Sequence, residues 1–244
     1  MRQDGELAYL ALTSKCEHAV RDRMALLLRK QLQSTAYVAR ELRLTKDEKT
    51  LSSEMREHLK SRHGQGKGGI DLAVLDRKTE TVLETLELKQ VYGFDFIPSS
   101  ISRIEGEPIP PMYKVELRKA RRDIDVQRLA AKTFKIDPSL CPLLLLAFDV
   151  LPLDGKSRVL PRIVKYQDGH LRRFAVPPME WAADADTFLR SDFWSKTSSE
   201  GETLRVAENW DCGDCEGFKV TLDAWLLYPR EAEGRVSAVG SPVT

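Results

Sequence analysis

The spacing of hydrophobic and polar residues changes along this chain, and each change marks the boundary of an expected helix or strand. From about Leu7 to Leu32 apolar residues recur at helical spacing, which predicts a helix broken near Thr13-Ser14. Residues 37–44 favour a short strand, and residues 46–60 favour a strongly charged helix. The segment HGQGKGG at 63–69 contains four glycines and therefore predicts a loop.

The clearest local signal is a β-hairpin. The segments 70–75 and 81–89 are rich in Ile, Val, Leu and Thr, and the polar stretch DRKTE separates them. A turn centred on Thr79 places residues whose numbers sum to 158 opposite one another, so that Asp71 lies opposite Glu87. Side chains alternate between the two faces of a strand, so Glu87 and Lys89 share one face.

The rest of the chain continues the alternation of helices and strands. A helix is expected over 114–134 and a shorter one over 179–195, and strands are expected at 143–151, 159–166, 203–209 and 217–228. This order predicts an α/β fold, with one mixed central β-sheet flanked by α-helices. We expect a single domain over 1–230, with a core at about 1–152, an elaboration over 153–230 and a flexible tail at 231–244.

Composition places the chain among soluble globular proteins. It has 244 residues, 42% of them hydrophobic and 31% charged, which suits one large domain. The four cysteines are too few and too scattered for a disulfide-stapled secreted fold. The longest apolar block begins at Leu143 and is broken by Asp149 and Pro152, far short of the roughly 20 residues that span a bilayer. These features predict a cytoplasmic protein without a membrane partner.

The candidate chemistry lies in the hairpin. Two carboxylates as close as Asp71 and Glu87 repel each other unless a cation lies between them. Magnesium suits such a pair, because it accepts one or two carboxylates and keeps several waters. Lys89 beside the pair could orient or help deprotonate an attacking water. The alternative is a structural ion pair, because Glu-x-Lys is common on strands by chance.

These residues resemble a known signature. Gly69-Ile70-Asp71, a hairpin and then Glu87-Leu88-Lys89 are similar to the PD-(D/E)XK motif of restriction-endonuclease-like nucleases, with Ile70 in place of the motif's proline. The resemblance covers roughly residues 1–152 and implies a restriction-endonuclease-like mixed sheet flanked by helices. It also implies that Asp71 and Glu87 bind Mg²⁺, for which Mn²⁺ can substitute, and that Lys89 assists the attack.

The context of the motif extends the resemblance. Many relatives place a glutamate in a helix ahead of the core strands, and this implies a catalytic role for Glu17, with Glu6 as a rival. A polar residue such as Gln90 often follows the lysine in these proteins. The charged helix expected over 114–134 and the apolar strand expected at 143–151 also follow the hairpin in the order that the resemblance implies.

Net charge alone gives no argument for a nucleic-acid partner, because it is only +1. Basic residues are instead concentrated in one segment, since residues 111–135 contain eight Lys or Arg against three acidic residues. Candidate phosphate contacts are Arg118, Arg121, Arg122 and Arg128 on one side of this helix, together with Lys67 in the glycine-rich loop. The alternatives are a solvated helix face and a flexible connector.

The resemblance implies a metal-dependent endonuclease that hydrolyses DNA, in restriction or other defence against foreign DNA, and acts as a homodimer. Two alternatives remain open at this point. One is a repair or recombination nuclease on branched or single-stranded DNA, and the other is a nucleic-acid-binding protein that keeps the fold without the chemistry. Cys212 and Cys215 have the spacing of a metal knuckle, but the sequence offers no second pair for a zinc site.

Overall fold

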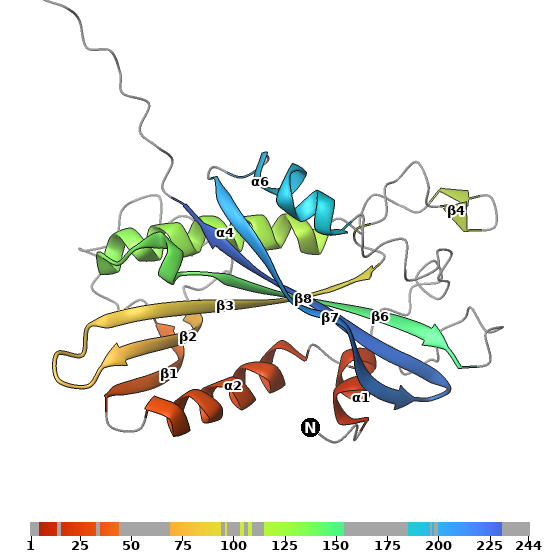
Figure 1. Cartoon of the computed structure of the whole chain (residues 1–244), viewed down its shortest axis with the longest axis horizontal. Helices are drawn as coiled ribbons and strands as arrows, with labels where there is room; N and C mark the ends of the chain where they lie inside the picture. Colours follow the sequence, from red (N-terminus) through yellow and green to blue (C-terminus); the bar gives the residue numbers. More distant parts are fainter. Residues whose placement is uncertain are drawn as a thin grey trace, which may run out of the picture.

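Six of the described strands form one mixed β-sheet at the centre of the protein, in the order β1-β2-β3-β6-β8-β7 (Figure 1). The computed structural model describes residues 5–13, 16–32, 35–43, 69–93, 96, 103–104, 107–108, 115–153, 185–195, 197 and 200–230. The strands are β1 (Ala36–Arg43), β2 (Gly69–Asp76), β3 (Val82–Tyr92), β6 (Leu143–Pro152), β7 (Gly201–Cys215) and β8 (Phe218–Pro229). A separate short ladder pairs β4 (Arg103–Ile104) with β5 (Glu107–Pro108). The predicted mixed α/β architecture is confirmed.

Helices cover both faces of this sheet. The helices α1 (Glu6–Thr13) and α2 (Glu17–Leu32) lie on one face, and α4 (Val115–Phe134) and α6 (Asp192–Ser195) lie on the other (Figure 1). The predicted break in the first helical segment is confirmed, because α1 ends at Thr13 and α2 begins at Glu17. Residues 185–190 are also helical, and a 3-10 turn, η3 (Pro138–Leu140), precedes β6.

The hairpin of β2 and β3 has the register that the turn predicts. Leu72 pairs with Leu86, Ala73 with Thr85 and Val74 with Glu84, so the paired numbers sum to 158, and the register shifts only nearer the turn. The carboxylate of Asp76 fixes this turn by accepting the backbone N–H groups of Lys78 and Thr79, each at 2.8 Å. A side chain that satisfies two turn N–H groups in this way favours one loop geometry and hence one register.

Strand β3 changes partner halfway along its length. Its first half pairs antiparallel with β2, whereas its second half, from Glu87 to Tyr92, pairs parallel with β6. A parallel pair needs a long crossover connection, which α4 provides between β3 and β6. Glu87 is therefore the residue at which β3 leaves one neighbour and joins the next.

Strand β6 is buried on both faces, which explains its continuous apolar sequence. Leu144, Leu146 and Phe148 belong to a hydrophobic cluster with α1 and α2. Leu143, Leu145 and Ala147 belong to a second cluster with α4, residues 185–193 and Trp225 of β8. The predicted buried strand at 143–151 is thus confirmed, and it holds the two layers of helices together.

Strand β7 is longer than the 203–209 segment expected from the sequence. Its pairing with β8 continues to Cys215. Register shifts after Arg205, Ala207 and Asp211 interrupt the alternation of side chains, so the sequence does not show the full length of the strand. The β7–β8 hairpin joins the central sheet beside β6.

Several sequence-based expectations fall outside the described residues. They concern the charged helix at 46–60, the loop residues 63–68, the strand at 159–166 and the tail at 231–244. Within the described part of the chain, no helix has the length and apolar character needed to cross a membrane.

Candidate functional site

The candidate site lies where β2 and β3 separate. Their ladder ends at the Leu72–Leu86 pair, and carboxylates then accept the backbone N–H groups of β3. The Leu88 N–H donates to Asp71 Oδ2 at 2.9 Å, and the Gln90 N–H donates to Glu17 Oε1 at 2.7 Å. Because the backbone donors are satisfied by carboxylates, the strands can part without leaving buried N–H groups unpaired.

The two carboxylates of the hairpin lie next to each other, as the register predicts. Glu87 is only 4% exposed, and its Oε2 accepts a long hydrogen bond of 3.4 Å from the backbone N–H of Asp71. The side chain of Asp71 is 20% exposed. Burial makes this pair of negative charges costly unless nearby cations compensate it.

Lys89 lies between carboxylates from helices on opposite faces of the sheet. Its Nζ is 3.8 Å from Glu17 Oε1 on α2 and 4.0 Å from Asp123 Oδ2 on α4. Lys89 is 7% exposed and Asp123 is 2% exposed. A buried ammonium is tolerated when anions on both sides compensate its charge, and these contacts also restrict where the ammonium can point.

The N-terminal end of α2 is fixed by a chain of buried hydrogen bonds. The Cys16 N–H donates to Gln90 Oε1 at 2.7 Å, and Gln90 Nε2 donates to the hydroxyl of Tyr92 at 3.1 Å. The Tyr92 hydroxyl in turn donates to the Ala11 carbonyl at 2.6 Å. Gln90 therefore holds the helix that carries Glu17 against β3.

A second helix is anchored to the same strand from the opposite side. The hydroxyl of Thr85 donates to Gln127 Oε1 on α4 at 2.6 Å, and both residues are fully buried. Asp123 precedes Gln127 by one helical turn, so this bond fixes where Asp123 lies along β3 relative to Lys89.

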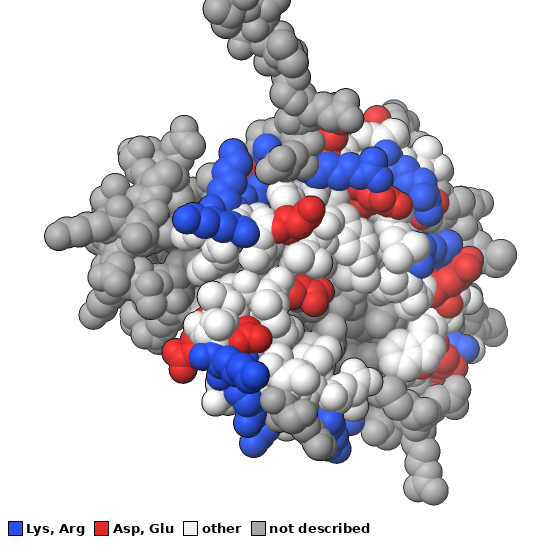
Figure 2. All heavy atoms as spheres, turned by 60° about the vertical axis from the view of Figure 1, so that its left-hand side comes forward, with Lys and Arg blue, Asp and Glu red and all other residues white. Residues whose placement is uncertain are grey.

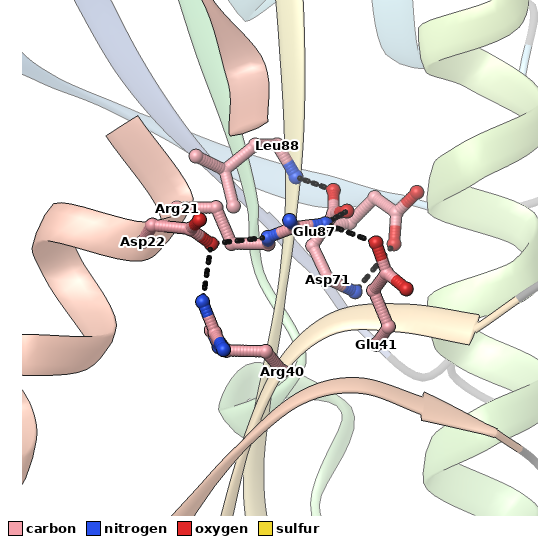
Figure 3. A network of polar contacts seen from close by, with 7 residues as sticks. All are labelled: Arg21, Asp22, Arg40, Glu41, Asp71, Glu87 and Leu88. Atoms are coloured by element: carbon pink, nitrogen blue, oxygen red, sulfur yellow. Dashed lines mark hydrogen bonds and ion pairs between the residues drawn. The ribbon is translucent and has the colours of Figure 1, made fainter. Parts of the chain in front are cut away.

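Arg21 joins α2 to both outer strands of the site (Figure 3). Its Nη1 is 2.7 Å from Glu41 Oε1 on β1 and 3.9 Å from Asp71 Oδ1 on β2. Its Nε donates to Asp22 Oδ1 at 3.1 Å, and Arg40 reaches the same oxygen at 3.2 Å. Sequence analysis missed Arg21 and Glu41; the available signal was that Arg21 lies one helical turn after Glu17.

These contacts set the charge states of the arginine cluster. Burial disfavours the charged guanidinium, but its hydrogen bonds with Asp22 and Glu41 outweigh burial and raise the pKa of Arg21. Burial likewise opposes ionisation of Asp22, but hydrogen bonds from Arg21 and Arg40 lower the pKa of that carboxyl. The guanidinium and the carboxylate therefore favour each other's charged form.

The basic residues expected to contact DNA occupy different environments. Arg118 and Arg122 are exposed on α4, whereas Arg128 is partly buried. Arg121 lies over the rings of Phe188 and Phe193, 5.4 Å from each centroid, and burial lowers the pKa of its guanidinium. Figure 2 shows Lys and Arg side chains along the upper part of one face and in a second group at its lower left, with Asp and Glu side chains among them. Lys67 lies outside the described residues.

The two candidate glutamates of the first helical segment have different surroundings. Glu6 forms an exposed ion pair with Arg23, at 3.0 Å. Glu17 Oε1 instead accepts the backbone N–H of Gln90 and lies 3.8 Å from Lys89 Nζ, both on β3. Of the two, Glu17 is therefore placed to act with the hairpin residues.

Several carboxylates and basic side chains contact one another around the hairpin. Within the described residues, the contacts above join six carboxylates to three basic side chains: Glu17, Asp22, Glu41, Asp71, Glu87 and Asp123, with Arg21, Arg40 and Lys89.

The donor set fits magnesium. The described part of the chain contains no group of three or more His, Cys, Asp or Glu side chains that could hold a metal ion by themselves. Magnesium does not require one, because it is commonly bound through one or two carboxylates, with waters and substrate phosphates as its other ligands. Asp71 and Glu87 carry hard carboxylate oxygens of this kind.

Cys212 and Cys215, which have the spacing of a metal knuckle in the sequence, lie on one strand. Both lie in β7, with Cys212 buried in the hydrophobic cluster beneath α1 and Cys215 packed against it. Burial raises the pKa of the Cys212 thiol to about 12, which keeps it protonated.

No protein-family model, no curated protein and no solved structure matches this chain. A fold by itself does not define an activity. The functional assignment therefore has to come from the side chains of the site described above.

Proposed function

We propose that this chain is a magnesium-dependent endonuclease of the restriction-endonuclease-like PD-(D/E)XK kind, which hydrolyses DNA phosphodiester bonds in restriction or other defence. The observation that carries the proposal is the convergence of Asp71, Glu87, Lys89 and Glu17 where β2 and β3 separate. Mn²⁺ is expected to substitute for Mg²⁺, because both suit oxygen ligands.

The order of elements supports this proposal. The resemblance implies a helix with a glutamate, a hairpin with the Asp and Glu-x-Lys residues, a charged helix and a buried strand. In this chain α2, the β2–β3 hairpin, α4 and β6 follow in that order. Glu17 Oε1 also lies 3.8 Å from Lys89 Nζ, a proximity that sequence spacing alone does not require.

Each residue of the site has a specific part in the proposed hydrolysis. Asp71 and Glu87 would hold the magnesium ion, which supplies charge that activates a water and stabilises negative charge on the phosphate. Lys89 would orient the water or a phosphate oxygen with its ammonium. Glu17 and Asp123 would keep this ammonium between their two carboxylates.

Contacts with the DNA backbone would come from α4. Arg118 and Arg122 are its exposed arginines, and such residues position a duplex without selecting sequence. Arg121 would contribute less, because its guanidinium packs against aromatic rings. Cleavage of both strands would require two sites, which a two-fold symmetric homodimer supplies.

Asp71→Ala should abolish cleavage while leaving DNA binding nearly unchanged, because the site loses a metal ligand but the basic surface is intact. Cleavage and binding are measured in parallel on end-labelled duplex, single-stranded and branched DNA, with Mg²⁺ or EDTA. Asp214→Ala, at an exposed position of β7, serves as the matched control and should cut like the wild type.

Each pattern of results has a distinct meaning. Preferred cutting of duplex DNA supports the defence role, and preferred cutting of branched or single-stranded DNA supports a repair or recombination nuclease. Binding without cutting by the wild type supports a non-catalytic binding protein. Cutting by Asp71→Ala at the wild-type rate would remove Asp71 from the active site.

A further inference from the structure

Side chains of β3 bind both ends of the break between α1 and α2, and we infer that two of them, Gln90 and Tyr92, are positioning residues of the proposed cleavage. They set where Glu17 lies, and Glu17 in turn sets where the ammonium of Lys89 points. The inference rests on the proposed function, because it concerns residues that would act in the hydrolysis.

A helix break leaves backbone groups of both helices without intrahelical partners. The carbonyl of Ala11 lies in the last turn of α1, the N–H of Cys16 directly precedes α2, and both residues are fully buried. The Tyr92 hydroxyl donates to that carbonyl at 2.6 Å, and Gln90 Oε1 accepts that N–H at 2.7 Å. Gln90 Nε2 donates to the Tyr92 hydroxyl at 3.1 Å, so the two side chains form one unit that holds both ends of the break.

The sequence of β3 becomes polar where the strand meets this break. Leu86 and Leu88 lie on the face of β3 that packs in the hydrophobic cluster with α1 and α2. The next two positions on that face are Gln90 and Tyr92, which are only 5% and 6% exposed. Burial of an amide and a hydroxyl is unfavourable unless both are hydrogen-bonded, so the backbone groups of the break explain these residues better than packing alone does.

Gln90 holds the start of α2 at two points. Its side chain binds the N–H of Cys16, and its own backbone N–H donates to Oε1 of Glu17, the first residue of α2, at 2.7 Å. The same Glu17 oxygen lies 3.8 Å from Lys89 Nζ. A small shift of the helix start would therefore move this oxygen relative to the ammonium, and a misplacement of about 1 Å can slow a catalysed reaction about a hundredfold.

The test is the single-turnover cleavage rate at saturating protein, on the DNA that the wild type cuts, for Gln90→Leu and Tyr92→Phe alone and combined with Glu17→Gln. We expect Gln90→Leu to cut about a hundredfold more slowly and Tyr92→Phe about tenfold more slowly, with unchanged affinity for DNA. Neither change should slow the Glu17→Gln protein further, because both act through Glu17. Thr203→Val is the matched control, because it removes a buried hydrogen bond from Trp194 Nε1 in β7, and it should cut like the wild type.

A second readout does not depend on cleavage. Amide hydrogen exchange in the first turn of α2 should become faster in Gln90→Leu and in Tyr92→Phe, because the helix start loses its attachment to β3. The same amides should exchange at the wild-type rate in Thr203→Val.

The outcomes separate the inference from the proposed function. A wild type that cuts DNA, together with folded Gln90→Leu or Tyr92→Phe protein that cuts equally fast, would overturn the inference alone. Losses that multiply with the loss in Glu17→Gln would also overturn it, because independent defects combine in this way. If Gln90→Leu does not fold, Tyr92→Phe decides, since it keeps the aromatic ring. A wild type that cuts neither duplex, single-stranded nor branched DNA would contradict the proposed function itself.

Discussion

Glu87→Gln is expected to reduce magnesium-dependent cleavage about a thousandfold while the protein stays folded. The amide keeps the size of the side chain and one oxygen acceptor, but it removes the negative charge that would hold the ion. Glu87 is 4% exposed and its Oε2 lies beside the backbone N–H of Asp71. The variant also relieves repulsion in an acidic site, so we expect no loss of thermal stability in the absence of metal.

The measurement is the single-turnover cleavage rate on an oligonucleotide duplex, together with the melting temperature with and without Mg²⁺. Glu84→Gln is the matched control, because Glu84 lies on the same strand at an exposed position. Magnesium should raise the melting temperature of the wild type and of Glu84→Gln but not that of Glu87→Gln. Equal cleavage rates for the two variants would show that Glu87 is not part of the active site.

Phe148→Ala is expected to cost about 3–5 kcal/mol of unfolding free energy, a large share of the roughly 5–15 kcal/mol that stabilises a typical domain. Phe148 is fully buried in the cluster formed with α1 and α2. It lies on β6 between Tyr92 of β3 and Leu222 of β8, so no neighbouring strand can move freely into the cavity.

Equilibrium unfolding in urea measures this change. Phe148→Leu keeps more of the apolar volume and should lose less stability than Phe148→Ala. Leu204→Ala, at a position of β7 that is 50% exposed, should change stability by no more than about 0.5 kcal/mol. A loss of similar size in Phe148→Ala and Leu204→Ala would contradict the description of β6 as the buried centre of the sheet.

The hairpin could be predicted because its determinants are local. Alternating apolar residues define β2 and β3, and the polar turn between them fixes which residues face each other, so the Leu72–Leu86 pairing was correctly expected. The buried strand β6 was also predictable, because a strand covered on both faces shows a continuous apolar run. The length of β7 was not, since its register shifts erase the alternation.

The surroundings of the hairpin residues depend on contacts that are distant in sequence. The distance from Lys89 to Asp123 is set by how α4 packs on β3, and 34 positions of chain separate the two residues. Arg21 meets Glu41 and Asp71 only because α2 crosses the outer strands. Periodicity indicates that such helices exist, but it does not indicate which strand residue a given helical side chain will contact. The catalytic role expected for Glu17 comes from the family resemblance, because its spacing in the sequence does not indicate that role.

The most direct test of the proposed nuclease is cleavage of supercoiled plasmid by the purified full chain, with Mg²⁺, with EDTA, and with Lys89→Ala in parallel. Lys89 is suited to this test because its ammonium lies between Glu17 and Asp123 at the centre of the site. We predict magnesium-dependent conversion to nicked or linear DNA by the wild type, and no conversion with EDTA or with Lys89→Ala. Cutting that persists in EDTA, or Lys89→Ala protein that cuts at the wild-type rate, would contradict the account.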